Sequence, residues 1–364
     1  MDWYSLLGKI NQGASVAKSL LEKEGRLDPS VALGALFDRR ISTIDSFHAS
    51  FEYLTENSYE DYPSLAHRDV YTFQNDRKTK LVLYGYRHPS PKGIVLCVHG
   101  LNALSDNHSA AFHDYFLQHG YDVFALDLSA CGRSGGFGIP GLHQSALDVA
   151  SAVAFIHSIA EFSPLPICLF GHSWGAYGVG ASLSLNSLPV AACCIAGFED
   201  PWAIMLGLPK SKVGPIAELS QDSVKDAMIA RGGDLCFLSA SESIENASIP
   251  VLLVHGDQDN VTGMKGVSLT AHKYHRRGIE KIIKKGCGHV NVFYPKEVNE
   301  YRAKVQEMVA PLKKKYGSAA KLPEEVRAEL VSSFSKAMCT QLDQKLFERI
   351  EALFAHSCGQ RLIG

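Results

Sequence analysis

The chain has 364 residues, of which 46% are hydrophobic and 20% charged, a composition typical of a water-soluble globular protein. Its formal net charge of -2 gives no electrostatic reason to expect a nucleic-acid partner. The nine cysteines include no C-x-x-C pair, and several stand in apolar runs, which favours a reducing compartment over a disulfide framework. No apolar stretch is long enough to span a membrane, and residues 1–21 are too polar for a secretory signal, so we expect a cytoplasmic protein.

Residues 1–66 are predicted to form a helical extension ahead of the main domain. Apolar residues recur at helical spacing between Trp3 and Leu21, and a second helix is expected to begin after Asp28-Pro29-Ser30. Three arrangements fit these helices: docking on the main domain, which we prefer, a homodimer interface, or a mobile helix over the active site or on a membrane surface.

Short apolar runs alternate with helical stretches from about residue 67 onward. Strands are predicted at 70–73, 81–86, 93–98, 123–126, 167–170, 190–195, 251–255 and 281–283. The first two flank a polar turn and are expected to form an antiparallel hairpin. The continuous apolar character of the others indicates a mostly parallel sheet with helices on both faces. Catalytic residues gather at the carboxyl ends of such strands, so polar residues just past a strand are the candidates.

The alternation of strands and helices breaks in two places. Residues 198–248 separate the core segments 67–197 and 249–310, and they are predicted to form a cap or lid over the carboxyl edge of the sheet. Residues 311–364 are too many for one closing helix and are predicted to form a C-terminal helical extension. Helices expected at 300–312 and 323–354 would join the N-terminal helices in an appendage.

The best-defined motif is Gly171-His-Ser-Trp-Gly175, which directly follows an apolar strand and precedes small residues that suit a closely packed helix. A serine in the middle of G-x-S-x-G, between a strand and a helix, is the arrangement of a nucleophile elbow. The tight turn strains the serine backbone, and the flanking glycines remove side chains that would collide there. Ser173 is therefore the predicted nucleophile, in preference to a chance match in a glycine-rich loop.

Two residues that follow strands complete a predicted catalytic triad with Ser173. Asp259 comes after the strand at 251–255, and His289 lies in a glycine-containing loop beyond the last strand. Serine needs a base to remove its proton, and histidine supplies one near neutral pH. A carboxylate then holds the imidazole in the required tautomer and stabilises the imidazolium.

Both partners of the nucleophile have rivals. For the acid, Asp200 ranks second and Asp257 third. Among the fifteen histidines, His172 is adjacent to the nucleophile but is expected to point elsewhere, and His255 lies within the strand before the acid loop. We therefore keep Asp259 as the predicted acid and His289 as the predicted base.

Two backbone N–H groups are expected to bind the oxyanion of the reaction intermediate. One belongs to Trp174, directly after the nucleophile, and the other to Leu101, in the loop that follows the strand at 93–98. Asp127 also follows a strand and is interpreted as holding its own loop. The apolar start of the cap supplies the candidate substrate contacts Trp202, Met205 and Leu206.

With these motifs in place, the chain from about residue 69 to 293 resembles the α/β-hydrolase superfamily, in the serine-hydrolase branch of monoacylglycerol lipases, carboxylesterases and proline-iminopeptidase-like enzymes. The matching pieces are His99-Gly100, the loop 127–134, Gly171-His-Ser-Trp-Gly175, Gly256-Asp-Gln-Asp259 and Gly288-His289. The resemblance implies an α/β-hydrolase fold, and it supports the second Asp of G-D-x-D as the acid. The order Ser173, Asp259, His289 is also that of the superfamily. The chain departs from the family at Ser129-Ala130-Cys131, where a basic or aromatic residue is usual, and in its helical ends.

We therefore predict a serine hydrolase that cleaves a carboxylic ester with an apolar acyl or alcohol group through an acyl-enzyme on Ser173. It is expected to act on a small-molecule ester or thioester without a cofactor or metal. One alternative is a thioesterase or acyltransferase for a carrier-bound acyl chain. Another is a ligand-binding receptor on a hydrolase scaffold, because fold does not fix function. An aminopeptidase is disfavoured because nothing marks an acidic pocket, and a dehalogenase or epoxide hydrolase would need Asp in place of Ser173.

Overall fold

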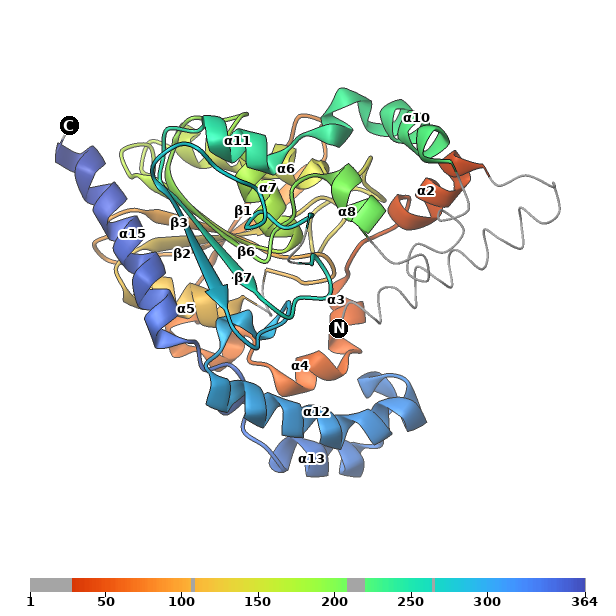
Figure 1. Cartoon of the computed structure of the whole chain (residues 1–364). Coiled ribbons are helices and arrows are strands. Elements are labelled where there is room, and N and C mark those ends of the chain that lie inside the picture. Colours follow the sequence, from red (N-terminus) through yellow and green to blue (C-terminus); the bar gives the residue numbers. More distant parts are fainter. Residues whose placement is uncertain (1–27, 106–108, 208–219, 264–265, 364) are drawn as a thin grey trace.

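The computed structural model describes residues 28–105, 109–207, 220–263 and 266–363, and the helix expected between Trp3 and Leu21 lies outside these ranges. In the described residues, one 8-stranded sheet has the order β1-β2-β4-β3-β5-β6-β7-β8 (Figure 1). The pairs β1–β2 and β2–β4 are antiparallel and all the others are parallel, which confirms the predicted hairpin and mostly parallel sheet. The strands are β1 (Asp69–Gln74), β2 (Lys80–Tyr86), β3 (Ile94–Val98), β4 (Asp122–Asp127), β5 (Ile167–His172), β6 (Pro189–Ile195), β7 (Val251–Gly256) and β8 (Ile279–Lys284).

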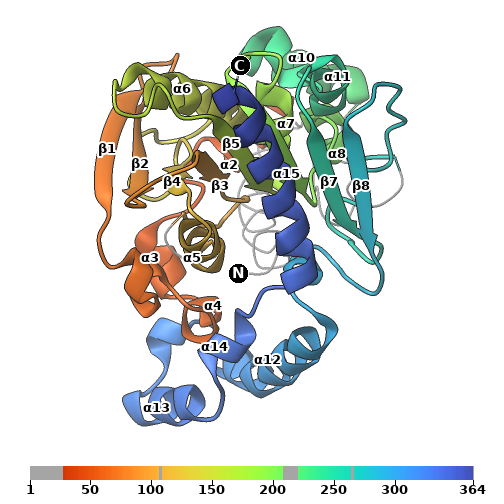
Figure 2. The ribbon, with the colours of Figure 1, turned by 90° about the vertical axis from the view of Figure 1, so that its left-hand side faces the viewer.

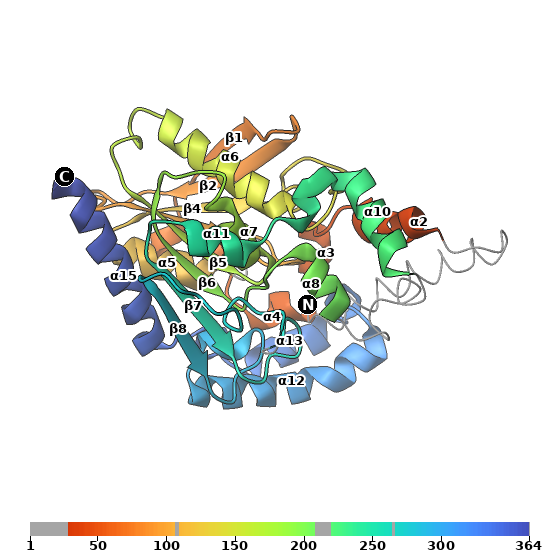
Figure 3. The same cartoon turned by 45° about the horizontal axis from the view of Figure 1, so that its top comes forward.

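The two faces of the sheet carry different helices. One face packs against α2 (Pro29–Phe37), α6 (Gln144–Ser158), α7 (Trp174–Ser182), α8 (Pro201–Gly207), α10 (Gln221–Gly232) and α11 (Ala240–Asn246). Of these, α6, α10 and α11 lie on the side that Figure 3 turns toward the reader. The other face is covered by α5 (Ala110–Gln118) and α15 (Gln344–Ile363), and Figure 2 shows α15 running across the sheet in front of β5.

The apolar sequence of the central strands explains this layering. Successive side chains of a strand point to opposite faces of the sheet, so a strand covered on both sides must be apolar throughout. In β5, Ile167 and Leu169 belong to the core on the α6–α7 side. Cys168 and Phe170, which alternate with them, belong to the core on the α5–α15 side.

The helix predicted over residues 323–354 is divided into three. They are α13 (Glu324–Ser332), α14 (Lys336–Cys339) and α15. Ser335 and Asp343 precede α14 and α15, and each side chain accepts a backbone N–H three residues later. Because such caps begin new helices, the single-helix prediction was wrong.

The last helix belongs to the core rather than to an extension. Phe347, Ile350 and Phe354 of α15 are fully buried against the sheet and α5. The predicted C-terminal extension over residues 311–364 therefore has to be shortened, because α15 belongs to the covering of the sheet.

Helices from the two ends of the chain form a separate group, which we call the helical appendage. It comprises α4 (Phe51–Thr55), α12 (Lys296–Tyr316), α13 and α14. Figure 2 shows these helices together below the sheet. Their apolar core includes Phe51, Leu54, Val305, Val309, Leu330 and Cys339. The short 3₁₀ turns Tyr59–Asp61 and Pro63–Leu65 lead from α4 to β1, and Asn291–Phe293 lies between β8 and α12. Before α4 comes α3 (Ile44–His48), and the 3₁₀ turn Ala319–Lys321 joins α12 to α13.

The predicted cap over residues 198–248 consists of two different parts. The helices α8 and α10 and the 3₁₀ turn Gly233–Phe237 follow β6, and α10 packs beside α2, where Arg231 bonds to Asp38. The helix α11 instead packs on α7, where a Cβ built on Gly180 would lie 3.0 Å from the Ile244 side chain. The segment 240–246 is thus the crossover helix between β6 and β7, and the cap prediction was too long at its end.

Candidate active site

Ser173 occupies the tight turn between β5 and α7. Its backbone has φ 56° and ψ -118°, a conformation that is strained for any residue with a Cβ. A Cβ built on Gly171 would lie 2.5 Å from the carbonyl oxygen of Gly175, and one built on Gly175 would lie 2.3 Å from that of Val98. Both glycines are therefore required by close backbone approach, and the turn has the geometry of the predicted nucleophile elbow.

Ser173, His289 and Asp259 lie in one row of hydrogen bonds. His289 Nε2 is 2.8 Å from Ser173 Oγ, and His289 Nδ1 is 2.8 Å from Asp259 Oδ2. An ionised carboxylate can only accept, so His289 carries its proton on Nδ1 and leaves Nε2 to accept the Ser173 hydroxyl. This is the tautomer that a general base needs in order to deprotonate serine.

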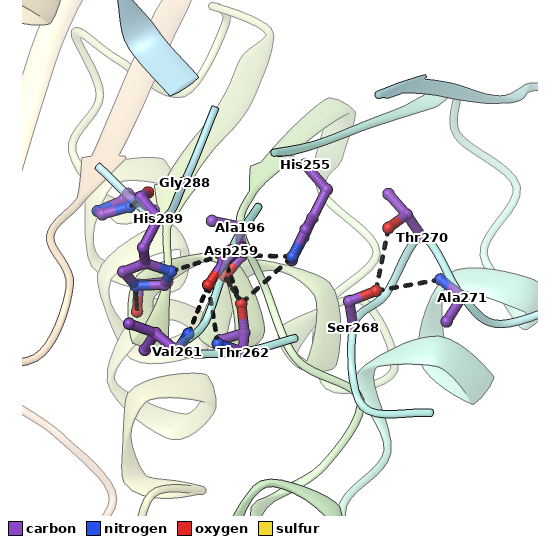
Figure 4. Close-up of polar contacts among 12 residues, drawn as sticks. Ala196, His255, Asp259, Val261, Thr262, Ser268, Thr270, Ala271, Gly288 and His289 are labelled. Carbon is purple, nitrogen blue, oxygen red and sulfur yellow. Dashed lines mark hydrogen bonds and ion pairs between the residues drawn. The ribbon is translucent and has the colours of Figure 1, made fainter. Parts of the chain in front are cut away.

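The Asp259 carboxylate is buried and surrounded by donors (Figure 4). Its Oδ1 accepts the backbone N–H groups of Val261 and Thr262 at 2.8 and 3.0 Å, and its Oδ2 accepts the Thr262 hydroxyl at 2.8 Å. Burial acts to raise the pKa of Asp259, but the hydrogen bonds that His255 and His289 donate outweigh burial and hold the pKa well below its usual range. Asp259 is therefore ionised at neutral pH.

The two rival carboxylates have other bonding partners. Asp257 is exposed, and its Oδ1 accepts the backbone N–H of Gly286 at 2.7 Å. Asp200 lies at the start of α8, and its Oδ1 accepts the N–H of Ala203 at 2.8 Å. In the part of the chain that the structure describes, Asp259 is the carboxylate that bonds to the His289 ring.

Close contact between the acid loop and the histidine loop depends on Gly256, at the end of β7. A Cβ built on Gly256 would lie 2.2 Å from the carbonyl oxygen of Cys287. The histidine loop is also held from the nucleophile side, because His172 Nε2 lies 3.0 Å from the carbonyl oxygen of His289. His172 therefore supports the backbone of the His289 loop instead of pointing away from the site.

The predicted oxyanion donors lie beside the nucleophile. Trp174 is the first residue of α7, so its N–H has no partner inside that helix. A Cβ built on Gly100 would lie 3.2 Å from the Ser173 Cβ, which places the loop that carries Leu101 against the serine turn. The binding of an oxyanion by Leu101 and Trp174 stays a prediction.

The loop with Leu101 is held by the loop after β4. Asp127 Oδ1 accepts the Ser105 hydroxyl at 2.5 Å, and Asp127 Oδ2 accepts the N–H of Arg133 at 2.9 Å. The Ser42 hydroxyl donates to the Ala103 carbonyl at 3.0 Å from the N-terminal segment. Asp127 thus holds its own loop, as predicted, and also fixes the loop beside Ser173.

The predicted substrate contacts lie on α8. Trp202 and Met205 are half-buried against the core, and the Trp202 ring meets Phe237 edge-on with 6.2 Å between the ring centroids. The side chain of Leu206 lies outside the described residues. In the described ranges no group of three or more His, Cys, Asp and Glu side chains is arranged to hold a metal ion. None of the helices in those ranges is long and apolar enough to cross a membrane.

The sheet order and the serine turn define the class of the protein. An antiparallel β1–β2 pair leading into a parallel sheet, with G-x-S-x-G between its central strand and a helix, is the α/β-hydrolase arrangement. Residues 89–196, which include β3 to β6, match the family model Hydrolase_4, described as serine aminopeptidase, S33. The chain therefore has the α/β-hydrolase fold that the sequence predicted, and residues 89–196 resemble that family.

Several solved structures resemble the chain at low sequence identity. The Pyrococcus furiosus esterase Pf2001 is 17% identical over 67% of this chain and 91% of its own, with a TM-score of 0.48. The α/β hydrolase GrgF from Penicillium sp. sh18 is 16% identical over 68% and 98%, with a TM-score of 0.49. An α/β serine hydrolase homologue from Coxiella burnetii is 14% identical over 73% and 97%, with a TM-score of 0.43. No curated protein sequence matches, and similarity at this level gives no substrate.

One residue of the site was missed at the sequence level. His255, which was assigned to the interior of β7, lies with its Nε2 3.2 Å from Asp259 Oδ2. The available signal was spacing, since a histidine at the end of a strand stands four residues before the acid. A tight turn after a strand returns the chain toward the strand end, and here it brings the two side chains together.

Proposed function

We propose that the protein is a serine hydrolase that cleaves a carboxylic ester through an acyl-enzyme on Ser173. The observation that carries the proposal is the continuous row from Ser173 Oγ through His289 to Asp259, with 2.8 Å at each step. The row lies where the carboxyl ends of β5, β7 and β8 meet, which is where parallel sheets place their catalytic residues. The family match over residues 89–196 supports the same class of enzyme.

Each step of ester cleavage has a group in place. Ser173 Oγ attacks the carbonyl carbon while its proton passes to His289 Nε2, and Asp259 stabilises the imidazolium that forms. The oxyanion is bound by the N–H groups of Leu101 and Trp174. His289 then gives the proton to the alcohol oxygen as the C–O bond breaks. Finally, water gives a proton to His289 and attacks the acyl carbon; the bond to Ser173 Oγ breaks, and His289 returns the proton to Oγ as the acid leaves.

The proposed substrate is a small molecule with an apolar acyl or alcohol group. The half-buried Trp202 and Met205 of α8 support this choice, because they follow β6 at the carboxyl edge of the sheet. A cytoplasmic location fits the nine cysteines, each of which is a buried free thiol. The homodimer through the helical ends stays a prediction.

The test is hydrolysis of p-nitrophenyl esters of increasing acyl length by the wild type and by Ser173→Ala. Turnover should fall by about 10³-fold or more in the variant, because triad residues act as a unit. Ser182→Ala is the matched control, since Ser182 is a buried serine on α7 whose hydroxyl bonds to the Val179 carbonyl. That variant should keep wild-type rates.

Three outcomes would change the proposal. Near-normal rates for Ser173→Ala would remove the serine from the reaction. Wild-type turnover of acyl thioesters alone, lost in the same variant, would make the enzyme a thioesterase or acyltransferase. Ligand-induced stabilisation without turnover of either class would favour a receptor on a hydrolase scaffold.

A further inference from the structure

The acid of the proposed triad is bonded by a second histidine. Figure 4 shows His255 and His289 on opposite sides of Asp259. His255 Nε2 lies 3.2 Å from Asp259 Oδ2, and His289 Nδ1 lies 2.8 Å from the same oxygen. We propose that His255 is a positioning residue, which holds the Asp259 carboxylate toward His289 and withdraws negative charge from it. This inference rests on the proposed function of the same site.

The protonation state of His255 follows from its surroundings. The carboxylate of Asp259 accepts and cannot donate, so the ring nitrogen that faces it carries the proton. In the described residues, His255 Nδ1 is buried and has no hydrogen-bond partner. A second N–H at Nδ1 would be costly there, because a buried donor without an acceptor loses its hydration. His255 is therefore neutral, with its proton on Nε2.

The position of the His255 ring is fixed by the sheet. His255 pairs with Ile283 of β8 in the parallel register of β7 and β8, and its side chain is 1% exposed. The Thr262 hydroxyl donates to the same carboxylate oxygen at 2.8 Å and lies 3.3 Å from the Ala196 carbonyl. A rigid strand and a hydroxyl thus hold Oδ2 from the side opposite to His289.

A donor on Oδ2 changes how strongly His289 keeps a proton. The His255 N–H stabilises the carboxylate and takes up part of the charge that would otherwise attract the His289 imidazolium. With His255 present, the Asp259 carboxylate therefore attracts the imidazolium that forms during the reaction less strongly. Asp259 bonds to both rings, and the titratable ring of His172 lies beside His289 with 5.0 Å between the ring centroids.

The first experiment compares the pH dependence of kcat/KM in His255→Leu, His255→Gln and the wild type. In His255→Leu the acid limb should move to higher pH by roughly half a unit, because Asp259 then attracts the imidazolium more strongly. We also expect kcat to fall roughly tenfold with KM within about twofold. In His255→Gln the amide N–H takes the place of Nε2, so the acid limb and most of kcat should return to wild-type values.

The matched control is His113→Leu. His113 is a buried histidine of α5, and neither ring nitrogen has a hydrogen-bond partner in the described residues. Its replacement makes the same chemical change away from the hydrogen bonds of Ser173, His289 and Asp259. The acid limb of the pH profile of kcat/KM should therefore not move. An unmoved limb in folded His255→Leu, or a Gln variant that behaves like the Leu variant, would overturn the proposal.

A second measurement needs no variant of His255. In the 15N-histidine-labelled wild-type protein near neutral pH, the His255 signals should show a protonated Nε2 and an unprotonated Nδ1. Protonation at Nδ1 would overturn the proposal whatever the kinetics show. Loss of turnover in Ser173→Ala tests the hydrolase itself, so failure of the enzyme assignment and failure of the His255 role give different results.

Discussion

The carboxyl edge of the sheet and the helical appendage are held together by different interactions. The edge concentrates buried polar groups around Asp259 and keeps Ser173 in a strained backbone conformation. The appendage buries apolar side chains around the ion pair of Arg302 and Glu56, whose atoms lie 2.8 Å apart. The edge thus gives up stability for a fixed arrangement of reactive groups, whereas the appendage has the apolar interior of an ordinary helical bundle.

This difference separates the expected effects of substitutions. At the edge, small chemical changes should reduce turnover strongly, because each group contributes to one proton path. In the appendage, comparable changes should reduce the free energy of unfolding and leave the rate of the folded enzyme unchanged.

Asp259→Asn should have the largest effect. The amide has nearly the same shape but offers His289 a donor or a neutral acceptor, so the required tautomer and the stabilisation of the imidazolium are lost. We expect kcat for an ester to fall by about 10³- to 10⁴-fold. Asp257→Asn, which changes an exposed carboxylate two residues away, is the control and should keep wild-type kcat. Similar losses in both variants would contradict the assignment of the acid.

Arg302→Met should have the next largest effect, on stability. Arg302 bonds to Glu56 and to the Cys339 carbonyl, and the Glu56 side chain is only 5% exposed. Removal of the guanidinium leaves a buried carboxylate without its cation, so urea unfolding should show a loss of about 3–5 kcal/mol. The kcat of the folded variant should equal that of the wild type.

The control for this change is an ion pair at the surface. Lys296 and Glu300 are 84% and 62% exposed, so Lys296→Met should change the free energy of unfolding by less than about 1 kcal/mol. If Arg302→Met lowered kcat in protein that is still folded, the appendage and the catalytic edge would not be energetically separate.

The sequence predicted the edge better than the appendage for a physical reason. A nucleophile elbow leaves local marks, since Gly171 and Gly175 are imposed by backbone contacts within a few residues of Ser173. The helices near the C-terminus are all amphipathic, so their pattern did not reveal that α15 packs on the sheet while α13 packs on α12. Ser335 and Asp343, which cap α14 and α15, are the sequence signals for the breaks between these helices.

Contacts between side chains were the least predictable part of the site. The histidine partner of the acid followed from its loop and its place in the chain, but the contact of His255 with the same oxygen depends on the path of the turn after β7. The role of Gly256 has the same origin, because its closest neighbour is the carbonyl of Cys287, which is distant in sequence. The sequence marks Gly256 through the Gly256-Asp-Gln-Asp259 motif and His255 through its spacing of four residues from the acid, but neither signal predicts the contact that the residue makes.

The smallest expected effect isolates the strain at the nucleophile. Ser173→Gly and Ser173→Ala both remove the hydroxyl, so the difference between them reports the backbone alone. Relief of a positive φ is worth about 1–3 kcal/mol, and the greater freedom of unfolded glycine costs about 0.5–1 kcal/mol. The Gly variant should therefore be more stable than the Ala variant by about 1 kcal/mol in urea unfolding.

The order of stability of the Gly and Ala variants should reverse at Ser151, in the middle of α6. There the Gly variant is expected to be less stable than the Ala variant by about 1 kcal/mol. A reversal between these two serines would show that the strain belongs to the elbow and not to glycine in general. The same sign at both positions would mean that Ser173 adopts its φ of 56° without cost, and that the edge does not give up stability for its geometry.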